Sequence, residues 1–133
     1  MRVTLDTNIL ISAGIFAGER TTSLTLRIAE EHSIVLPSLI IDELNTVMAL
    51  KFREKEPALE RFLKRLSYEL VHTPDEIDEE VFPKVRDKKD YPILASAIIA
   101  DVDVFVTGDK DFGGLDLKRP EILTLGEFEN KYF

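Results

Sequence analysis

Two aspartates lie where an apolar, strand-like run ends, a placement typical of active sites in α/β proteins. Asp6 directly follows the run at residues 3–5, and Asp109 comes two residues after the run at 104–107. Because sites in open parallel sheets form at the carboxyl ends of strands, we expect both side chains at one edge of the sheet. Carboxylates gathered there repel one another unless a cation lies among them. Ordinary turn and cap chemistry explains either aspartate taken alone.

Glu43 is a third candidate, because its helical neighbours predict that it faces inward. The positions three and four residues away hold Leu39, Ile40, Thr46 and Val47, and three of these four are apolar. The preceding residue, Asp42, has mainly polar neighbours instead. An inward carboxylate without a partner is costly. Glu43 should therefore have a cation or a raised pKa, unless it lies at the edge of the apolar stripe with its tip in water.

Further aspartates extend this acidic set. Asp90 precedes a strongly helical run, where it could cap the helix, although a helix N-terminus also favours a bound phosphate. Asp87 is close enough along the chain to take either role in its place. Asp111 follows Asp109 at a spacing of two, which in an extended loop would direct both side chains to one side. The sequence thus offers four or five carboxylates, and oxygen ligands of this kind suit Mg²⁺ or Mn²⁺.

The composition agrees with one acidic domain. The chain has 133 residues, of which 44% are hydrophobic, and this length suits one core. Cysteine is absent, so disulfides and thiolate metal sites are excluded. No apolar stretch reaches the roughly 18 residues of a membrane span and no signal-peptide pattern is present, so we expect a cytoplasmic protein without a membrane partner. The formal charge of −8 argues against a generic nucleic-acid binder but suits a site crowded with carboxylates.

Strand-like and helical runs alternate along the chain. Strands are predicted at residues 3–5, 34–36, 69–72, 104–107 and 122–125. Helices are predicted from Thr21 or Thr22 to 31, at 39–52, 57–66 and 91–100, weakly at 74–85, and in a short C-terminal segment. The chain between Asp6 and the first helix is predicted as a connection. The alternation favours a single α/β domain over residues 1–133, with a parallel sheet covered by helices on both faces.

Four segments together resemble one known family. They are Val-Thr-Leu-Asp-Thr-Asn at 3–8, Pro-Ser-Leu-Ile-Ile-Asp-Glu-Leu at 37–44, Asp-Tyr-Pro-Ile-Leu-Ala-Ser-Ala at 90–97 and Phe-Val-Thr-Gly-Asp-Lys-Asp-Phe at 105–112. Their order and spacing resemble the PIN-domain family, particularly the small prokaryotic VapC-like toxins of toxin–antitoxin systems, over nearly the whole chain. The pattern departs from the family's where Asp87 and Asp90 flank a Lys-Lys pair, which leaves the third acid open between them.

The resemblance implies a fold, an activity and a set of site residues. The fold is a PIN-like three-layer sandwich, with a central parallel sheet of about five strands flanked by helices. The activity is metal-dependent endonucleolytic hydrolysis of RNA phosphodiesters at an acidic two-metal-type site, with one or two Mg²⁺ or Mn²⁺ ions. The implied catalytic residues and metal ligands are Asp6, Glu43, Asp90 and Asp109, with Asp111 as an auxiliary ligand and Asn8 and Thr107 as hydrogen-bonding support.

The same resemblance implies partners. These are an RNA substrate, a cognate antitoxin that blocks the pocket, and a second copy of the chain in a homodimer. The basic residues adjoining Asp90 are the better candidates for RNA contact; they are Lys84, Arg86, Lys88 and Lys89. A second basic group comprises Lys51, Arg53, Lys55, Arg61, Lys64 and Arg65, and it is better explained as solvated helix surface because three glutamates interleave with it.

Two alternatives come from other classes of protein. A receiver-type phosphoacceptor module shares this size and alternation, but it requires an acid pair after the first strand, where only Asp6 is present. Acetyl phosphate would distinguish it, because a receiver would form a stable aspartyl phosphate and show no nuclease activity. The other alternative is a catalytically silent PIN-fold protein that acts by binding, because retained acids do not prove turnover.

Overall fold

The structure is a computed structural model and describes residues 1–16, 19–76, 91–112 and 117–133, apart from the side chains of Glu19, Tyr91 and Asp111. In chain order its elements are β1 (Arg2–Leu5), α1 (Thr7–Gly14), α2 (Glu19–Glu31), β2 (Ser33–Pro37), α3 (Ser38–Lys51), η1 (Arg53–Lys55), α4 (Glu56–Leu66), β3 (Glu69–Val71), α5 (Tyr91–Ile99), β4 (Val104–Val106), η2 (Lys110–Phe112), β5 (Glu121–Leu123) and α6 (Leu125–Tyr132). No helix in these ranges is long and apolar enough to cross a membrane.

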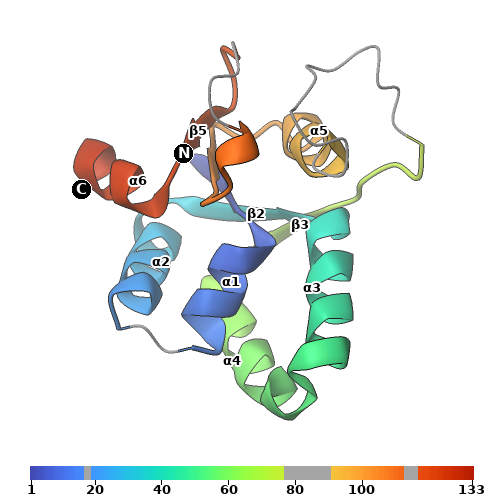
Figure 1. The fold of residues 1–133 in the computed structure, drawn as a ribbon. Helices are drawn as coiled ribbons and strands as arrows, with labels where there is room; N and C mark the ends of the chain where they lie inside the picture. The colour runs from blue at the N-terminus through green and yellow to red at the C-terminus, as the bar shows by residue number, and fades with distance from the viewer. Residues whose placement is uncertain (17–18, 77–90, 113–116) are drawn as a thin grey trace.

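The five strands form one parallel sheet in the order β3-β2-β1-β4-β5. The predicted parallel sheet between helices is therefore confirmed, and helices α1, α2 and α4 lie on one side of it with α5 on the other (Figure 1). This strand order differs from the 2-1-3-4-5 order of receiver-type proteins. The topology therefore contradicts the receiver-type alternative.

The three central strands are apolar because both of their faces are covered by helices. All three residues of β4 are buried, and in β1 only Arg2 is partly exposed. Thr4, fully buried in β1, donates its hydroxyl proton to the carbonyl oxygen of Val35 at 2.7 Å, which satisfies its polar group within the core. Burial on both faces holds the strand ends in place, and the candidate site is built on those ends.

One predicted connection is wrong, because the chain after Asp6 is a helix. Helix α1 begins at Thr7 directly after β1, and its buried side includes Leu10, Ile11 and Ala13. Its residues are β-branched and apolar enough to resemble a strand, so the helical period was hidden. Asp6 is the N-cap of this helix, and its carboxylate accepts a hydrogen bond from the Thr7 backbone N–H at 2.7 Å. The cap interpretation of Asp6 thus holds alongside its place at the end of a strand.

Other elements differ from prediction mainly at their ends. Helix α2 begins at Glu19 instead of Thr21 or Thr22, and β4 ends at Val106, one residue early. Strand β5 begins one residue earlier than predicted, at Glu121, and ends two residues earlier, at Leu123, because Thr124 caps α6 through a reciprocal pair of hydrogen bonds with Glu127. In the weakly helical run predicted at 74–85, residues 74–76 are not helical and 77–85 lie outside the described residues.

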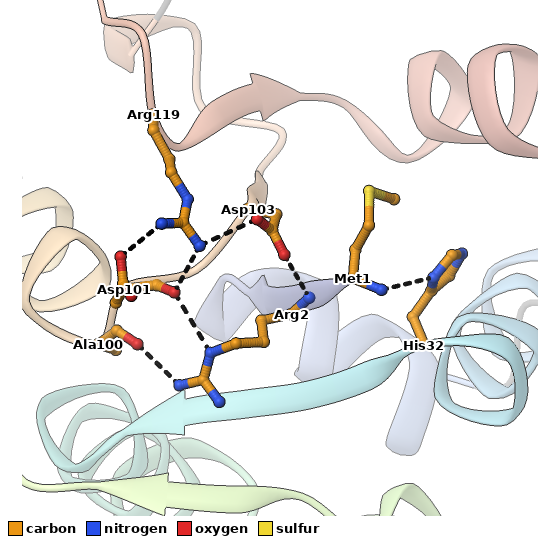
Figure 2. Close-up of polar contacts among 7 residues, drawn as sticks. All are labelled: Met1, Arg2, His32, Ala100, Asp101, Asp103 and Arg119. Atoms are coloured by element: carbon orange, nitrogen blue, oxygen red, sulfur yellow. Dashed lines mark hydrogen bonds and ion pairs between the residues drawn. The ribbon is translucent and has the colours of Figure 1, made fainter.

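A polar network joins the strands at the edge of the sheet where β1, β4 and β5 begin (Figure 2). Asp103 accepts hydrogen bonds from the Arg2 backbone N–H at 2.8 Å and from the Arg119 guanidinium at 2.9 Å. Arg2 also donates to the carbonyl oxygens of Ala100 and Asp101. Because these contacts link the chain before β5 to β1 and β4, they fix the relative positions of the strands whose opposite ends carry the candidate site.

Candidate active site

Asp6 lies at the carboxyl end of β1 and is held there from two directions. Its backbone N–H donates to the carbonyl oxygen of Val106 at 3.0 Å, so it lies beside the end of β4. One carboxylate oxygen accepts from the Thr7 backbone N–H, and the other accepts from the Thr107 hydroxyl at 2.7 Å. Asp6 is only 8% exposed, so its carboxylate has little freedom to change orientation.

Thr107 connects Asp6 to Asp109 through its hydroxyl group. Its hydroxyl donates to Asp6 and accepts from the Asp109 backbone N–H at 3.0 Å. Its own backbone N–H donates to the carbonyl oxygen of Leu123 at 2.9 Å, which ties it to β5. A single buried threonine therefore sets where two carboxylate-bearing segments stand relative to each other.

Burial raises the pKa of Asp6. The hydrogen bonds from Thr107 and Thr7 oppose this shift, and the nearby charge of Asp109 adds to it. The same interaction means that ionised Asp6 and Asp109 repel each other. A cation bound between these acids would offset both the burial of the Asp6 charge and the repulsion between the two carboxylates.

Glu43 differs from its prediction, because its side chain is exposed instead of facing inward. The buried residues of α3 are Ile40, Leu44 and Met48, spaced by four, so Glu43 lies at the margin of the apolar stripe. The neighbours at three and four positions indicated the correct side of the helix but not the depth of burial. Its pKa is nevertheless raised, first by partial desolvation of its carboxyl group and then by the charge of Asp6. The carboxyl group therefore belongs to the surroundings of Asp6 even though the residue reaches solvent.

Thr7 contributes a buried hydroxyl that makes no hydrogen bond of normal geometry. The residue is 1% exposed, and its Oγ1 has no hydrogen-bond partner among the residues that the structure describes. This hydroxyl acts on Glu43, whose pKa it lowers, without forming a hydrogen bond of normal geometry. Unsatisfied buried hydroxyls are rare in native proteins, so this atom is expected to meet a ligand or a water molecule.

Asp6 and Asp109 border an open cleft of ≈ 340 Å³. Its lining consists of Asp6, Asn8, Ile9, Ser12, Gly108 and Asp109. Helix α1 forms one wall, and the loop after β4 forms the other. Asn8 is exposed there, so its amide can reach a molecule bound in the cleft.

Several predicted site residues cannot be compared with this geometry. Asp90 and its competitor Asp87 lie outside the described residues, as do Lys84, Arg86, Lys88 and Lys89. The backbone of Asp111 lies in η2, but its side chain is not among those described. Within the described part of the chain, no three acidic or histidine side chains are arranged to hold a metal ion.

The described donors nonetheless fit a hard divalent cation. Asp6, Glu43 and Asp109 offer only oxygen, which Mg²⁺ and Mn²⁺ prefer. A bound cation would offset the mutual repulsion of Asp6 and Asp109, and one of its water molecules could form the hydrogen bond that the buried Thr7 hydroxyl lacks. Such an arrangement is suited to hydrolysis at a phosphate.

A larger cleft of ≈ 470 Å³ lies at the opposite edge of the sheet and lacks these properties. Its acids Asp103 and Glu121 are already paired with Arg119 and Lys131. Hydrogen bonds to these carboxylates lower the pKa of each, so both are stable as anions without a metal. Of these two clefts, the smaller one therefore has the acidic residues that would gain from a bound cation.

Sequence reasoning did not identify Thr7, Ile9 and Ser12 as part of the site. All three are in α1, the helix that was not predicted. Its N-cap at Asp6 was a usable signal, because a helix starting there would place Asn8 and Ser12 on one face at a spacing of four.

Comparisons with known proteins agree with this geometry. A family model described as PIN domain matches residues 2–111. The fold is similar to that of a chain in the crystal structure of VapBC2 from Rickettsia felis bound to a DNA fragment from their promoter. The TM-score is 0.67 and the sequence identity is 20%, over 92% of this chain and 97% of that chain. A search of curated proteins found no match.

Proposed function

The chain belongs to the PIN-domain family, whose members are generally nucleases that use divalent metal ions, and we propose that it is a metal-dependent endoribonuclease. In this proposal residues 1–133 form one PIN-like domain that hydrolyses RNA phosphodiesters with Mg²⁺ or Mn²⁺. The observation that carries it is the chain of contacts from Asp6 through Thr107 to Asp109 beside an open cleft.

The chain's own residues have separate roles in this mechanism. Asp6, Glu43 and Asp109 would hold the cation, with Asp90 and Asp111 completing the set. The cation would lower the pKa of a water molecule and stabilise negative charge on the phosphate oxygens. Thr107 keeps Asp6 in one orientation, so the carboxylate needs no reorganisation when substrate binds. The pKa of Glu43 is raised in the metal-free protein, and a cation bound beside it would favour the ionised carboxylate.

A cleavage assay tests this function. Structured and unstructured RNAs are incubated with Mg²⁺, Mn²⁺ or EDTA and with wild type, Asp6→Asn or Glu43→Gln. The matched control is Asp42→Asn, because Asp42 is exposed beside Glu43 on the polar face of α3. We expect metal-dependent cleavage by wild type and Asp42→Asn, and a loss of at least about a hundredfold in the two site variants. Equal cleavage by all four proteins would indicate a contaminating nuclease and contradict the proposal.

The absence of cleavage by any of these proteins would favour the second candidate function, a catalytically silent PIN-fold binding protein. That outcome is decisive if wild type is folded by circular dichroism and binds Mn²⁺ in calorimetry. The matched metal-binding measurement separates a silent domain from a misfolded one.

We also propose that the protein is the toxin of a toxin–antitoxin pair and forms a homodimer. The support for the toxin role is the likeness in fold to a chain of the VapBC2 complex over nearly the full length of both chains. The homodimer is proposed from the resemblance to VapC-like toxins alone. The proposal predicts a small neighbouring gene whose product restores the growth of cells that express this chain. Rescue should coincide with loss of RNA cleavage by the purified complex. A genome neighbourhood without such a gene, or unimpaired growth without any antitoxin, would contradict the toxin role.

A further inference from the structure

Phe16, directly beyond α1, is an exposed aromatic residue that another ring holds in place. It is 60% exposed, and its ring lies edge to face with that of Phe52 at a centroid distance of 5.2 Å. Phe52 is half-buried and caps the C-terminal end of α3. Since Phe52 packs against the core, it anchors the exposed ring without covering it.

Basic residues lie next to Phe52, the inner ring of this pair, along the chain. Lys51, Arg53 and Lys55 are all exposed, and none forms an ion pair with another residue in the described ranges. From residue 51 to residue 65 the chain has six basic and three acidic residues, although its overall formal charge is −8. This segment is therefore locally cationic in an acidic protein.

The aromatic pair also lies past the C-terminal end of the helix that forms one wall of the acidic cleft. Asn8 and Ser12 are exposed at a spacing of four and share one face of α1, and Phe16 lies two residues beyond the last residue of that helix. Asn8 and Ser12 line the cleft. Helix α1 has eight residues and is thus about 12 Å long, and in Figure 1 it runs from the sheet toward α4. Phe16 lies beyond the end of the cleft that is farther from Asp6.

We propose that Phe16, Phe52 and the exposed bases Lys51, Arg53 and Lys55 form a docking surface for single-stranded RNA. One or more unpaired bases stack on Phe16, and the basic side chains contact the adjoining phosphates. This inference rests on the proposed function, because it places the flank of a substrate whose scissile phosphate occupies the acidic cleft. The acidic cleft does not itself attract a polyanion, and the basic side chains of this surface supply that attraction.

The charge around Phe16 favours RNA over an apolar protein segment as the occupant. An apolar segment would bury Phe16 and Leu50, which is 79% exposed, but would gain nothing from the three adjacent cations. A phosphodiester strand uses the ring and the cations together. The second basic group, from Lys51 to Arg65, was explained from sequence as solvated surface, and the place of its first three members next to Phe52 is what changes that interpretation.

The chain has no tryptophan, so one substitution creates a specific probe. Phe16→Trp is titrated with an oligouridylate in EDTA, which prevents metal-dependent cleavage. We expect saturable quenching of tryptophan fluorescence by at least half, weakened by added salt. The matched control is Leu70→Trp, since Leu70 is 58% exposed on the edge strand β3. Equal quenching of both probes, or quenching of neither, would overturn the docking surface.

Fluorescence anisotropy of labelled RNA provides a second measurement that does not depend on the probe. In EDTA, Phe16→Ala and the double variant Lys51→Ala/Arg53→Ala should each bind at least fivefold more weakly than wild type. Lys118→Ala removes an exposed charge near the opposite edge and should have less than a twofold effect. If Lys118→Ala weakens binding as much as the double variant does, the attraction is unspecific and the inference fails.

Parallel cleavage by wild type separates this inference from the proposed function. Cleavage by wild type without quenching of the Phe16→Trp probe would overturn the docking surface and leave the proposed nuclease activity intact. Quenching without cleavage would support the docking surface and contradict the nuclease activity. The emission of the Phe16→Trp variant could also shift to the blue as protein concentration rises, without any response to RNA. That result would show that a second copy of the chain covers this face, and it would overturn the RNA-docking surface.

Discussion

The Thr107 hydroxyl donates a 2.7 Å hydrogen bond to Asp6, although 101 positions separate the two residues in the sequence. The contact joins the ends of adjacent parallel strands, β1 and β4, and Thr107 accepts the Asp109 backbone N–H at the same time. One hydroxyl group therefore organises the two acids that line the cleft.

Replacing Thr107 by valine should disturb both acids. The pKa of Asp6 should rise further, because the Thr107 hydrogen bond now lowers it, and the Asp109 N–H should lose its acceptor. A lost buried hydrogen bond costs about 1–3 kcal/mol, so we expect at least about a fivefold fall in the metal-dependent cleavage rate. Thr107→Ser keeps the hydroxyl and should stay within about threefold of wild type. Equal rates for valine and serine would show that the hydrogen bond does not matter.

Divalent cations should stabilise the folded protein through Asp6. Mn²⁺ at about a hundred times its dissociation constant should raise the free energy of unfolding by about 2.7 kcal/mol relative to EDTA. In Asp6→Asn the gain at the same Mn²⁺ concentration should largely disappear, while Asp42→Asn should behave as wild type. Thermal unfolding with and without Mn²⁺ measures the difference. A full gain in Asp6→Asn would place the cation elsewhere.

The stability of the metal-free protein should depend on the ionisation of Asp6 and Glu43. Both pKa values are raised in the folded state, so the folded protein holds protons that the unfolded chain has already released. Stability contributed by these groups is therefore full below about pH 4 and declines as pH rises toward their raised pKa values. Relative to wild type, Asp6→Asn should become progressively more stable over this interval. Urea unfolding in EDTA at several pH values tests this, and a difference between the two proteins that does not vary with pH would contradict it.

The network at the opposite edge should affect stability without affecting chemistry. Asp103→Ala removes the acceptor of the Arg2 backbone N–H and of the Arg119 side chain, and should lower the free energy of unfolding by about 1 kcal/mol, since solvent screens these groups. The pKa of Asp103 is lowered, first by the Arg2 hydrogen bond, so this loss should be present at neutral pH and vanish in acid. Asp75→Ala, at an exposed aspartate, is the control. A changed cleavage rate for folded Asp103→Ala would show that the two edges are coupled.

Local sequence patterns were sufficient for most of the architecture. Apolar runs of three or four residues, alternating with helical periods, predicted the parallel sheet, because the type of an element depends on neighbours along the chain. They failed at α1, where β-branched residues obscured a short helix, and consequently Thr7 and Ser12 were missed. At Glu43 the helical period indicated the correct side of α3, but not that the residue lies at the margin of its buried stripe.

The sequence by itself thus determined the kinds of elements, the acidic residues at their ends and the resemblance to the PIN-domain family. Only the tertiary structure decided the strand order, the contact of Thr107 with Asp6 and Asp109, and the position of Phe16 beyond the cleft on Phe52. The reason is physical, since those contacts join residues far apart in the chain. They exist only because packing on both faces of the sheet selects one arrangement of the strands.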